Sequence, residues 1–573
     1  MNDGSKQAAL SYDHGISTEP LVGSTLGKFF DEIVASRKDA EALISVQQNI
    51  RMTYAQLLER VNLFACGLLR LGIERGDRIG IWSTNNAEWI VTQLAAAKVG
   101  AILVNINPGY RTSELEYVLS QSGVKVLVVI QKHRSSDYLA MLEELAPTFF
   151  VAGDEKPSAK LPNLEQIVVI GVHSKLPGRL LSFDQVTAMG AELPAAKLVE
   201  REGKLQFDDP VNIQYTSGTT GLPKGVTLSH HNLLNNALLA AQAMGLGPTS
   251  RFCVPMPFYH CGGMISSSLA TLAVGGAVIV PSPFYDDTAV LHAVQAEKCT
   301  HISGVPTMFI GELEHPEFDS FDVSSLRGGF MAGAPCPVQL MRRVADRMKM
   351  EEIVILYGLT EASPLMTATT SNDSLEIRST TVGKVIPGLE LKVVDPLTGE
   401  VLPRGEQGEI CCRGHGVMLG YWNNPQATAD AIDKNGWLHS GDLGVMNAEG
   451  FINITGRKKD MIIRGGENIY PREIEEVLHE HASIAQAQVF GIPDARLGED
   501  VAAWIMVKQS ESLEPEAVRE WLKERIGYFK VPRHVKVVTE FPMTVTGKCQ
   551  KFVMRQQMIK ELGLEASSQV QTA

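Results

Sequence analysis

Strands and helices alternate over much of the first 130 residues, and this alternation limits the fold more than any other feature. Three short apolar runs predict strands, over 78–82, 101–105 and 124–130. Two segments with helical spacing separate them, 87–98 and 113–121. Strands joined by helices of this length form parallel sheets that are covered on both faces. We therefore predict an α/β fold built on parallel sheets.

Later segments extend this pattern and then change it. Helices are predicted over 53–72, 288–298, 337–350 and 471–480, and a further strand over 353–356. Thr53 and Gln56 could form a capping box at the start of the first of these helices, and Pro471 suits the first turn of the last. Between 382 and 416, short strands alternate with turn signals, which predicts a small β-rich subdomain. We predict a large N-terminal domain over 1–456, a hinge over 457–460 and a small mobile C-terminal α/β domain over 461–573.

The composition and the net charge limit which binding partners and which cellular compartment we expect. The formal net charge of -13 argues against a nucleic acid held by phosphate contacts. The eight cysteines contain no C-x-x-C pair, which favours a reduced, intracellular protein. The first 18 residues lack the apolar core of a secretory signal. The longest apolar stretch, 269–280, is broken by two glycines and predicts a buried helix-to-strand passage. We expect a soluble, cytoplasmic protein, with peripheral membrane contact and a homodimer left open.

One loop combines the groups that bind phosphate. The segment 215–225 (YTSGTTGLPKG) contains four serine and threonine hydroxyls, three glycines and one lysine. Glycines let the backbone approach an anion, hydroxyls donate to phosphate oxygens, and a lysine neutralises their charge. The segment does not end in the Gly-Lys-Ser/Thr of the P-loop. A surface loop rich in serine and threonine is the alternative reading.

The order of these residues resembles the signature of the adenylate-forming superfamily, which includes acyl-CoA synthetases, luciferases and the adenylation domains of peptide synthetases. In that family the loop is mobile and holds the β- and γ-phosphates of ATP. The resemblance assigns this role to Thr216, Ser217, Gly218, Thr219, Thr220 and Lys224. Further motifs follow in the family's order over nearly the whole chain.

The segment 357–361 (YGLTE) comes directly after a predicted strand, and open α/β sheets bind ligands at the carboxyl ends of their strands. By the resemblance, Tyr357 stacks on adenine, Thr360 touches the α-phosphate and Glu361 binds Mg²⁺. A carboxylate suits this hard cation. An ordinary strand-to-loop turn is the alternative. Gly333, Ala334 and Pro335 resemble the segment that lines the adenine face in the family.

Two further motifs point to the ribose and to a hinge. Asp442 matches the aspartate that accepts hydrogen bonds from both ribose hydroxyls, and Arg457 matches an arginine that helps to hold the ribose. Lys459 lies where the family has its hinge residue. A solvated charged turn is the alternative for this run of basic residues.

Lys548 matches the catalytic lysine of the family's C-terminal domain. When a carboxylate attacks the α-phosphorus two anions meet, so a bridging cation stabilises the transition state more than the ground state. Members of the family then rotate their small domain. Gly465 and Gly466 match the segment that faces the pantetheine chain of coenzyme A after this rotation. A tight turn between two strands is the alternative for this glycine pair.

The acyl site is indicated by His260, which matches a residue that borders the acyl carboxylate and later the thioester. A buried structural histidine is the alternative. In relatives specific for acetate or propionate, a tryptophan close to the position of Gly358 closes the pocket. By the resemblance, Gly358 would therefore leave the acyl pocket deep, as would Gly262 and Gly263. This favours an aliphatic acid of medium or longer chain, as in medium-chain fatty acyl-CoA synthetases.

The resemblance therefore implies an AMP-forming acid–thiol ligase that uses ATP, Mg²⁺ and coenzyme A. It would activate a medium- to long-chain fatty acid as an acyl-adenylate and transfer the acyl group to coenzyme A. Two alternatives stay open: an aryl-acid or carrier-protein ligase of the same fold, and a nucleotide-binding protein without catalysis. The second is disfavoured because four functional residues are all present, Lys548, Glu361, Asp442 and Arg457.

Overall fold

The computed structural model describes most of the chain, namely residues 9–134, 136–153, 156–172, 175–216, 222–334, 336–464, 467–494, 496–508, 511–543 and 549–564. Contacts divide the chain into two compact units. The larger unit comprises residues 13–391 and 412–438, and the smaller comprises 1–12, 392–411 and 439–573. Among the described helices, none is long and apolar enough to cross a membrane.

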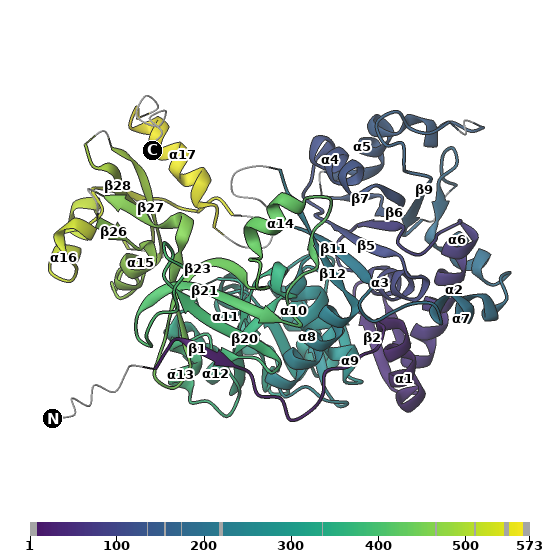
Figure 1. The fold of residues 1–573 in the computed structure, drawn as a ribbon, viewed down its shortest axis with the longest axis horizontal. Helices are drawn as coiled ribbons and strands as arrows, with labels where there is room; N and C mark the ends of the chain where they lie inside the picture. The colour runs from purple at the N-terminus through teal and green to yellow at the C-terminus, as the bar shows by residue number, and fades with distance from the viewer. Residues whose placement is uncertain are drawn as a thin grey trace. The chain divides into compact units, whose positions relative to one another are not determined.

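An eight-stranded sheet belongs to the larger unit, in the order β10-β9-β6-β4-β5-β11-β12-β22. Figure 1 labels β9, β6, β5, β11 and β12 of this sheet. Its strands are β4 Arg78–Trp82, β5 Ile102–Ile106, β6 Val124–Ile130, β9 Gln166–Ile170, β10 Leu181–Ser182, β11 Pro210–Thr216, β12 Lys224–Ser229 and β22 Gly420–Tyr421. The first three pair in parallel, with α3 Ala87–Val99 and α4 Thr112–Ser122 between them in sequence. The predicted parallel arrangement is confirmed.

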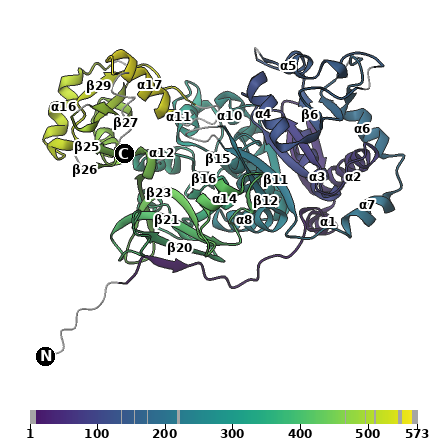
Figure 2. The same cartoon turned by 45° about the horizontal axis from the view of Figure 1, so that its top comes forward.

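Helices cover both faces of this sheet. α4 and α5 (Tyr138–Leu145) lie on one side, and α1 (Leu26–Arg37), α2 (Tyr54–Arg70) and α3 lie on the other (Figures 1 and 2). α2 starts with a capping box, in which Thr53 Oγ1 accepts from Gln56 N–H and Gln56 Oε1 accepts from Thr53 N–H. Further helices are α6 Phe183–Gly190, α7 Ala195–Glu202 and α8 His230–Ala243.

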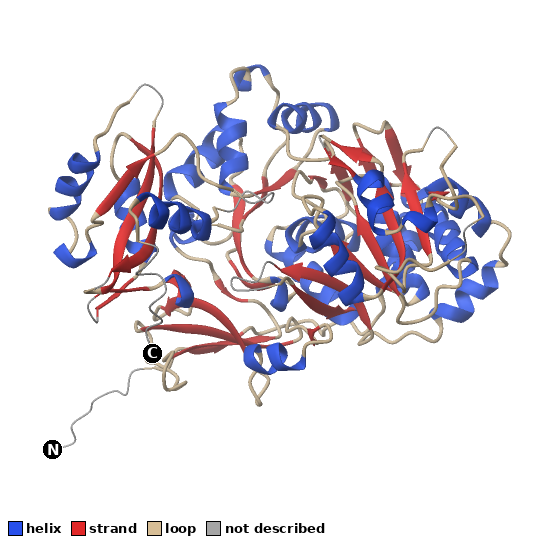
Figure 3. Cartoon of the chain, turned by 90° about the horizontal axis from the view of Figure 1, so that it is seen from above, coloured by secondary structure: helices blue, strands red, loops and turns tan. Residues whose placement is uncertain are grey.

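A nine-stranded sheet also belongs to the larger unit, and helices again flank its strands (Figure 3). In sheet order its strands are β19 Lys384–Val385, β18 Leu365–Ala368, β17 Glu352–Gly358, β16 Gly328–Met331, β15 His301–Gly304, β13 Arg251–Cys253, β14 Ala277–Val280, β2 Glu41–Ser45 and β3 Ile50–Thr53. β17, β16, β15 and β13 run parallel, so their carboxyl ends share one edge.

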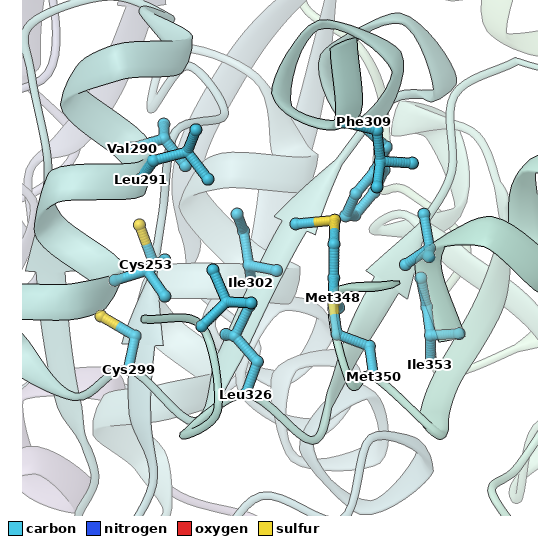
Figure 4. Packing of buried hydrophobic residues seen from close by; sticks show 14 of the residues in the cluster. Cys253, Val290, Leu291, Cys299, Ile302, Phe309, Leu326, Met348, Met350 and Ile353 are labelled. Carbon is cyan, nitrogen blue, oxygen red and sulfur yellow. The ribbon is translucent and has the colours of Figure 1, made fainter. Parts of the chain in front are cut away.

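The core of this sheet is built from its strands and from α10 Asp287–Glu297, α11 Pro306–Glu314 and α12 Val338–Arg347 (Figure 4). The helix predicted over 337–350 is shorter than expected: α12 ends at Arg347. Lys349 takes a left-handed φ of 62°, which a helix does not allow. This turn directs Met348 and Met350 into the core (Figure 4).

The apolar stretch 269–280 is a buried helix-to-strand passage, as predicted. It begins at the end of the π-helix η2 (Gly262–Leu269), continues in α9 (Ala270–Ala273) and ends in β14. Gly275 makes the turn between helix and strand at a φ of 77°, a conformation that favours glycine.

The β-rich segment is also confirmed. β20 Leu389–Val394 and β21 Gln407–Gly414 belong to a five-stranded sheet with β1 Tyr12–His14, β23 Leu438–Met446 and β24 Ile452–Arg457, in the order β1-β20-β21-β23-β24. The turn between β20 and β21 forms where predicted, because Asp395 Oδ1 accepts from Leu397 N–H and Thr398 N–H, both at 2.8 Å.

A second five-stranded sheet forms the C-terminal α/β part of the smaller unit. β25 Ile462–Arg464, β26 Glu467–Ile469, β27 Ile484–Asp494, β28 Gly498–Val507 and β29 His534–Val537 pair in the order β26-β25-β28-β27, with β29 on β28. Its helices are α15 Pro471–His479, α16 Pro515–Lys523 and α17 Lys551–Glu561. Pro471 takes the first helical position of α15, as predicted. The α/β fold class is therefore confirmed.

Candidate functional site

The β11–β12 hairpin holds both ends of the predicted phosphate loop. Thr216 and Lys224 are directly paired, and Thr216 Oγ1 donates to Lys224 O at 3.5 Å. The remaining phosphate residues, Ser217, Gly218, Thr219 and Thr220, lie outside the described residues. Lys224 Nζ lies 5.0 Å from the centroid of the Tyr421 ring. A cation at this distance is attracted to the face of an aromatic ring.

Glu361 follows the carboxyl end of β17, in the short helix η4 (Thr360–Ala362). Its Oε1 accepts a hydrogen bond from the Tyr421 hydroxyl at 2.8 Å. Burial, and then the charge of Glu361, raise the pKa of Tyr421 above its ordinary value, so the phenol stays a donor. The bond to Tyr421 uses one carboxylate oxygen and leaves the second for a hard cation. Glu361 thus fits the Mg²⁺ role that the resemblance implies.

Tyr421 is a functional residue that sequence reasoning missed. It contacts both Lys224 and Glu361, which are separated by more than a hundred residues in the chain. It reaches them because β22 pairs with β12, placing Tyr421 opposite Val226. A two-residue strand has no periodic signal, so the sequence offered no sign of this position.

The predicted adenine segments lie at adjacent strand ends. Gly333 and Ala334 follow β16, and Tyr357 is near the end of β17, its parallel neighbour. Gly333 has a φ of 82°, which allows the chain to turn sharply after the strand. Pro335, predicted with them, lies outside the described residues. The shared edge is where open α/β sheets bind ligands.

His260 ends a turn that follows β13. Asn85 fixes this turn, because its Oδ1 accepts from Phe258 N–H at 2.7 Å and its Nδ2 donates to Met256 O at 2.9 Å. The thiol of Cys261 lies 3.6 Å from His260 Nδ1 and 3.7 Å from Thr360 Oγ1. Two predicted site residues from distant segments are therefore joined through one cysteine, which the sequence did not single out.

Gly358 has a different role from the one the sequence suggested. A Cβ atom at this position would lie 1.7 Å from the carbonyl oxygen of Pro364. The same carbonyl accepts a hydrogen bond from Leu359 N–H at 2.9 Å, so it is part of the turn that positions Thr360 and Glu361. The glycine is required by this close backbone approach, and it therefore carries no argument about the depth of an acyl pocket.

Asp442 and Arg457 form an ion pair in the smaller unit. The two residues are directly opposite in the β23–β24 pairing, and Arg457 Nε donates to Asp442 Oδ1 at 3.1 Å. Asp442 N–H donates to Ser440 Oγ, and that hydroxyl donates to Ile410 O. The side chain of Asp442 is 13% exposed, so the carboxylate is held in a defined position.

Glu409 supports this corner and was also missed by sequence reasoning. It is buried on β21, where it accepts from Gly441 N–H at 3.2 Å and contacts His439 Nδ1 and Lys458 Nζ. Burial alone would raise the pKa of Glu409, but the hydrogen bond with His439 and the charge of Lys458 lower it below its ordinary value. An ionised carboxylate therefore joins segments next to both Asp442 and Arg457.

Four other predicted positions belong to the smaller unit. Lys459 is in the short helix η5 (Lys458–Asp460), directly after β24. Gly465 and Gly466 separate the paired residues of a β25–β26 hairpin, and they lie outside the described residues, as does Lys548. The tight turn and the role at a thiol channel both stay predictions for this glycine pair.

Comparison with known proteins gives a consistent result. The sequence model of the family described as "AMP-binding enzyme" matches residues 30–422, and that of the "AMP-binding enzyme C-terminal domain" matches 473–548. The chain is 44% identical over 548 residues to the putative acyl-CoA synthetase YngI of Bacillus subtilis, covering 96% of this chain and 99% of that protein. It is 43% identical over 558 residues to the mitochondrial medium-chain acyl-CoA ligase ACSF2 of Danio rerio, covering 97% of this chain and 91% of that protein.

A solved structure agrees with these relatives. ATP-bound MatB from Rhodopseudomonas palustris superposes with a TM-score of 0.81 at 27% identity, covering 94% of this chain and 100% of that one. The similarity therefore extends over almost the full length of all three proteins.

Proposed function

The chain belongs to the AMP-binding enzyme family, and we propose that it is an AMP-forming acyl-CoA synthetase that acts on fatty acids of medium or longer chain. In the first half-reaction the fatty acid carboxylate attacks the α-phosphorus of ATP, which gives an acyl-adenylate and pyrophosphate. In the second, the thiol of coenzyme A attacks the acyl carbon and releases AMP. The near full-length similarity to a medium-chain acyl-CoA ligase supports both the reaction and the substrate class.

The observation that carries this proposal is the arrangement around Tyr421, whose ring lies under Lys224 Nζ and whose hydroxyl donates to Glu361. A lysine and a carboxylate fixed at neighbouring positions suit a nucleoside triphosphate and its Mg²⁺, because the lysine can bind phosphate and the carboxylate can bind the cation. Glu361 would bind Mg²⁺, which neutralises phosphate charge when bound. Lys224 and Thr360 would bind phosphate oxygens. His260 would border the acyl carboxylate, which is supported by the Cys261 thiol that contacts both His260 and Thr360.

Asp442 and Arg457 are proposed to hold the ribose. Their ion pair orients the carboxylate, and the contacts of Ser440 and Glu409 keep the strand ends that carry them in place. Lys548 is proposed to bridge the attacking carboxylate and the α-phosphate, where a positive charge lowers the barrier most.

The reaction and the acid are tested together by coenzyme A-dependent AMP release with saturated acids of two to sixteen carbons and with benzoate. A maximum among medium or long aliphatic acids supports the proposal. AMP release with benzoate alone would move the protein to the aryl-acid ligases. Acid-dependent pyrophosphate exchange without acyl-CoA formation would favour a carrier protein, and no exchange with any acid would favour a non-catalytic protein.

The hinge at 457–460 is a proposal with its own test. Lys459→Pro fixes the backbone φ at this residue and removes its N–H donor. If the chain turns here between the half-reactions, the variant keeps acid-dependent pyrophosphate exchange and loses acyl transfer to coenzyme A. Equal loss of both half-reactions would place the turn elsewhere.

Location and assembly are further proposals. We propose a cytoplasmic enzyme of lipid metabolism, with peripheral membrane contact for the lipid substrate and a homodimeric state. Cell fractionation, sedimentation with phospholipid vesicles and size-exclusion chromatography with light scattering test these three points. Recovery only with organelles, no sedimentation, or a monomeric mass would each overturn the corresponding point.

A further inference from the structure

Three side chains with metal-binding atoms meet in the smaller unit. Glu409 and Cys411 are two residues apart on β21, so their side chains share one face of the sheet. His439 is on β23, the neighbouring strand in the sheet. The ligand atoms of all three lie within 4.8 Å of one another.

Their spacing suits a single ion. His439 Nδ1 lies 3.2 Å from Glu409 Oε2 and 3.4 Å from Cys411 Sγ. Zinc binds nitrogen and oxygen at about 2.0–2.2 Å and sulfur at about 2.3 Å, so tetrahedral ligand atoms are about 3.3–3.6 Å apart. The two separations therefore need little change to accept the ion.

The donor types select the ion. A thiolate and an imidazole favour zinc-like ions, whereas Mg²⁺ and Ca²⁺ prefer oxygen donors. Cys411 and Glu409 are buried, whereas the His439 side chain is 33% exposed and gives solvent a way in. We propose that Glu409, Cys411 and His439 form a binding site for a divalent ion of the zinc class, with water as the fourth ligand.

Lys458 is the group that the ion would replace. Its ammonium lies 3.3 Å from Glu409 Oε2, and its side chain is 45% exposed, so it has room to turn into solvent. The incoming ion takes over the neutralisation of the buried carboxylate. Cys411 binds as the thiolate, and its proton passes to the solvent.

The site lies beside the residues proposed to hold the ribose. Glu409 accepts from Gly441 N–H, directly before Asp442, and Lys458 follows Arg457. Movement of Lys458 would alter the start of η5, which contains the proposed hinge residue Lys459. This consequence rests on the proposed function, whereas binding of the ion does not.

The test measures metal binding by the full-length chain, in a Cys336→Ser/Cys549→Ser background that removes the two cysteines that are not buried. Competition with a chelating dye should show one Zn²⁺ per chain that millimolar Mg²⁺ does not displace. Co²⁺ in place of Zn²⁺ should give the near-ultraviolet charge-transfer absorption of a thiolate–cobalt bond. This second measurement requires no change at the site itself.

A matched pair of variants locates the site. Cys411→Ser should weaken Zn²⁺ binding at least tenfold and abolish the thiolate–cobalt band. Cys412→Ser, the next residue on β21 and on the opposite face, should leave both unchanged. The proposal would be overturned if the protein with Cys411 intact gave no thiolate–cobalt band. Equal Zn²⁺ binding by the Cys411→Ser and Cys412→Ser variants would also overturn it.

Discussion

The hydroxyl of Tyr421 donates to Glu361 Oε1 at 2.8 Å, so a two-residue edge strand holds the carboxylate proposed to bind Mg²⁺. The same ring lies 5.0 Å from Lys224 Nζ. One aromatic side chain thus links the hairpin of the phosphate loop to the turn after β17. This link makes Tyr421 the first position to change.

Tyr421→Phe removes the hydrogen bond and keeps the ring beside Lys224. A hydrogen bond to a charged group contributes about 1.5–3 kcal/mol, so acid-dependent pyrophosphate–ATP exchange should slow by about tenfold or more. Tyr421→Leu loses both contacts and should slow exchange further. Exchange by the phenylalanine variant at the unchanged rate would show that the bond does not position Glu361.

Lys548→Ala tests the residue assigned to the first half-reaction. Because a charge that stabilises only the transition state is lost, adenylation should slow by about 10²–10³-fold. Thioester formation from synthetic acyl-adenylate and coenzyme A should continue. The assignment of Lys548 would be wrong if the variant adenylated normally and failed only in acyl transfer.

Gly358→Ala should destabilise the protein rather than alter its choice of acid. Its Cβ would lie 1.7 Å from Pro364 O, a backbone atom that has to move. We expect the free energy of unfolding to fall by about 3 kcal/mol, as measured by urea denaturation.

Gly262→Ala is the matched control, because its Cβ would meet the flexible end of Met256 at 2.7 Å. This change should cost much less stability than Gly358→Ala. Equal stability of the two variants would show that the Pro364 carbonyl moves easily, and would restore Gly358 as a position for testing the acyl pocket.

His230 makes stability depend on pH. Burial lowers the pKa of this histidine to about 4, and its Nδ1 accepts from Leu26 N–H, which favours the neutral ring. A lowered pKa means that the unfolded chain binds more protons between about 6.5 and 4. The contribution of His230 is therefore complete above about pH 6.5 and falls by about 3 kcal/mol as pH drops to about 4.

His230→Asn keeps an acceptor near Leu26 N–H and removes the titrating ring. The free energy of unfolding of this variant should depend less on pH between about 4 and 6.5. The exposed His292 on α10 provides the control, since His292→Asn should leave the pH dependence unchanged. An identical pH profile for His230→Asn and the parent would refute the assignment.

Local patterns predicted the parts of the fold that depend on neighbouring residues. The capping box of Thr53 and Gln56, the proline that starts α15 and the parallel strands around β4 all formed as expected, because short-range hydrogen bonds and apolar periodicity decide them. The end of α12 was missed, since burial of Met350 outweighed the helical pattern.

The supporting residues of the site could not be predicted from the sequence, because contacts between distant segments determine them. Tyr421 reaches Glu361 through strand pairing, and Glu409 reaches His439 across neighbouring strands. Gly358 is explained only by a carbonyl from the following turn. No local spacing signals such contacts, which is why motif resemblance identified the family but not these supporting residues.

The central claim is that a carboxylate attacks the α-phosphorus of ATP. The most direct measurement uses decanoate labelled with ¹⁸O in its carboxylate, together with ATP and coenzyme A, and determines the label by mass spectrometry of the nucleotide product. Attack at the α-phosphorus transfers one carboxylate oxygen to AMP, so the account predicts singly labelled AMP and unlabelled pyrophosphate. Unlabelled AMP, or ADP with labelled phosphate, would contradict the account.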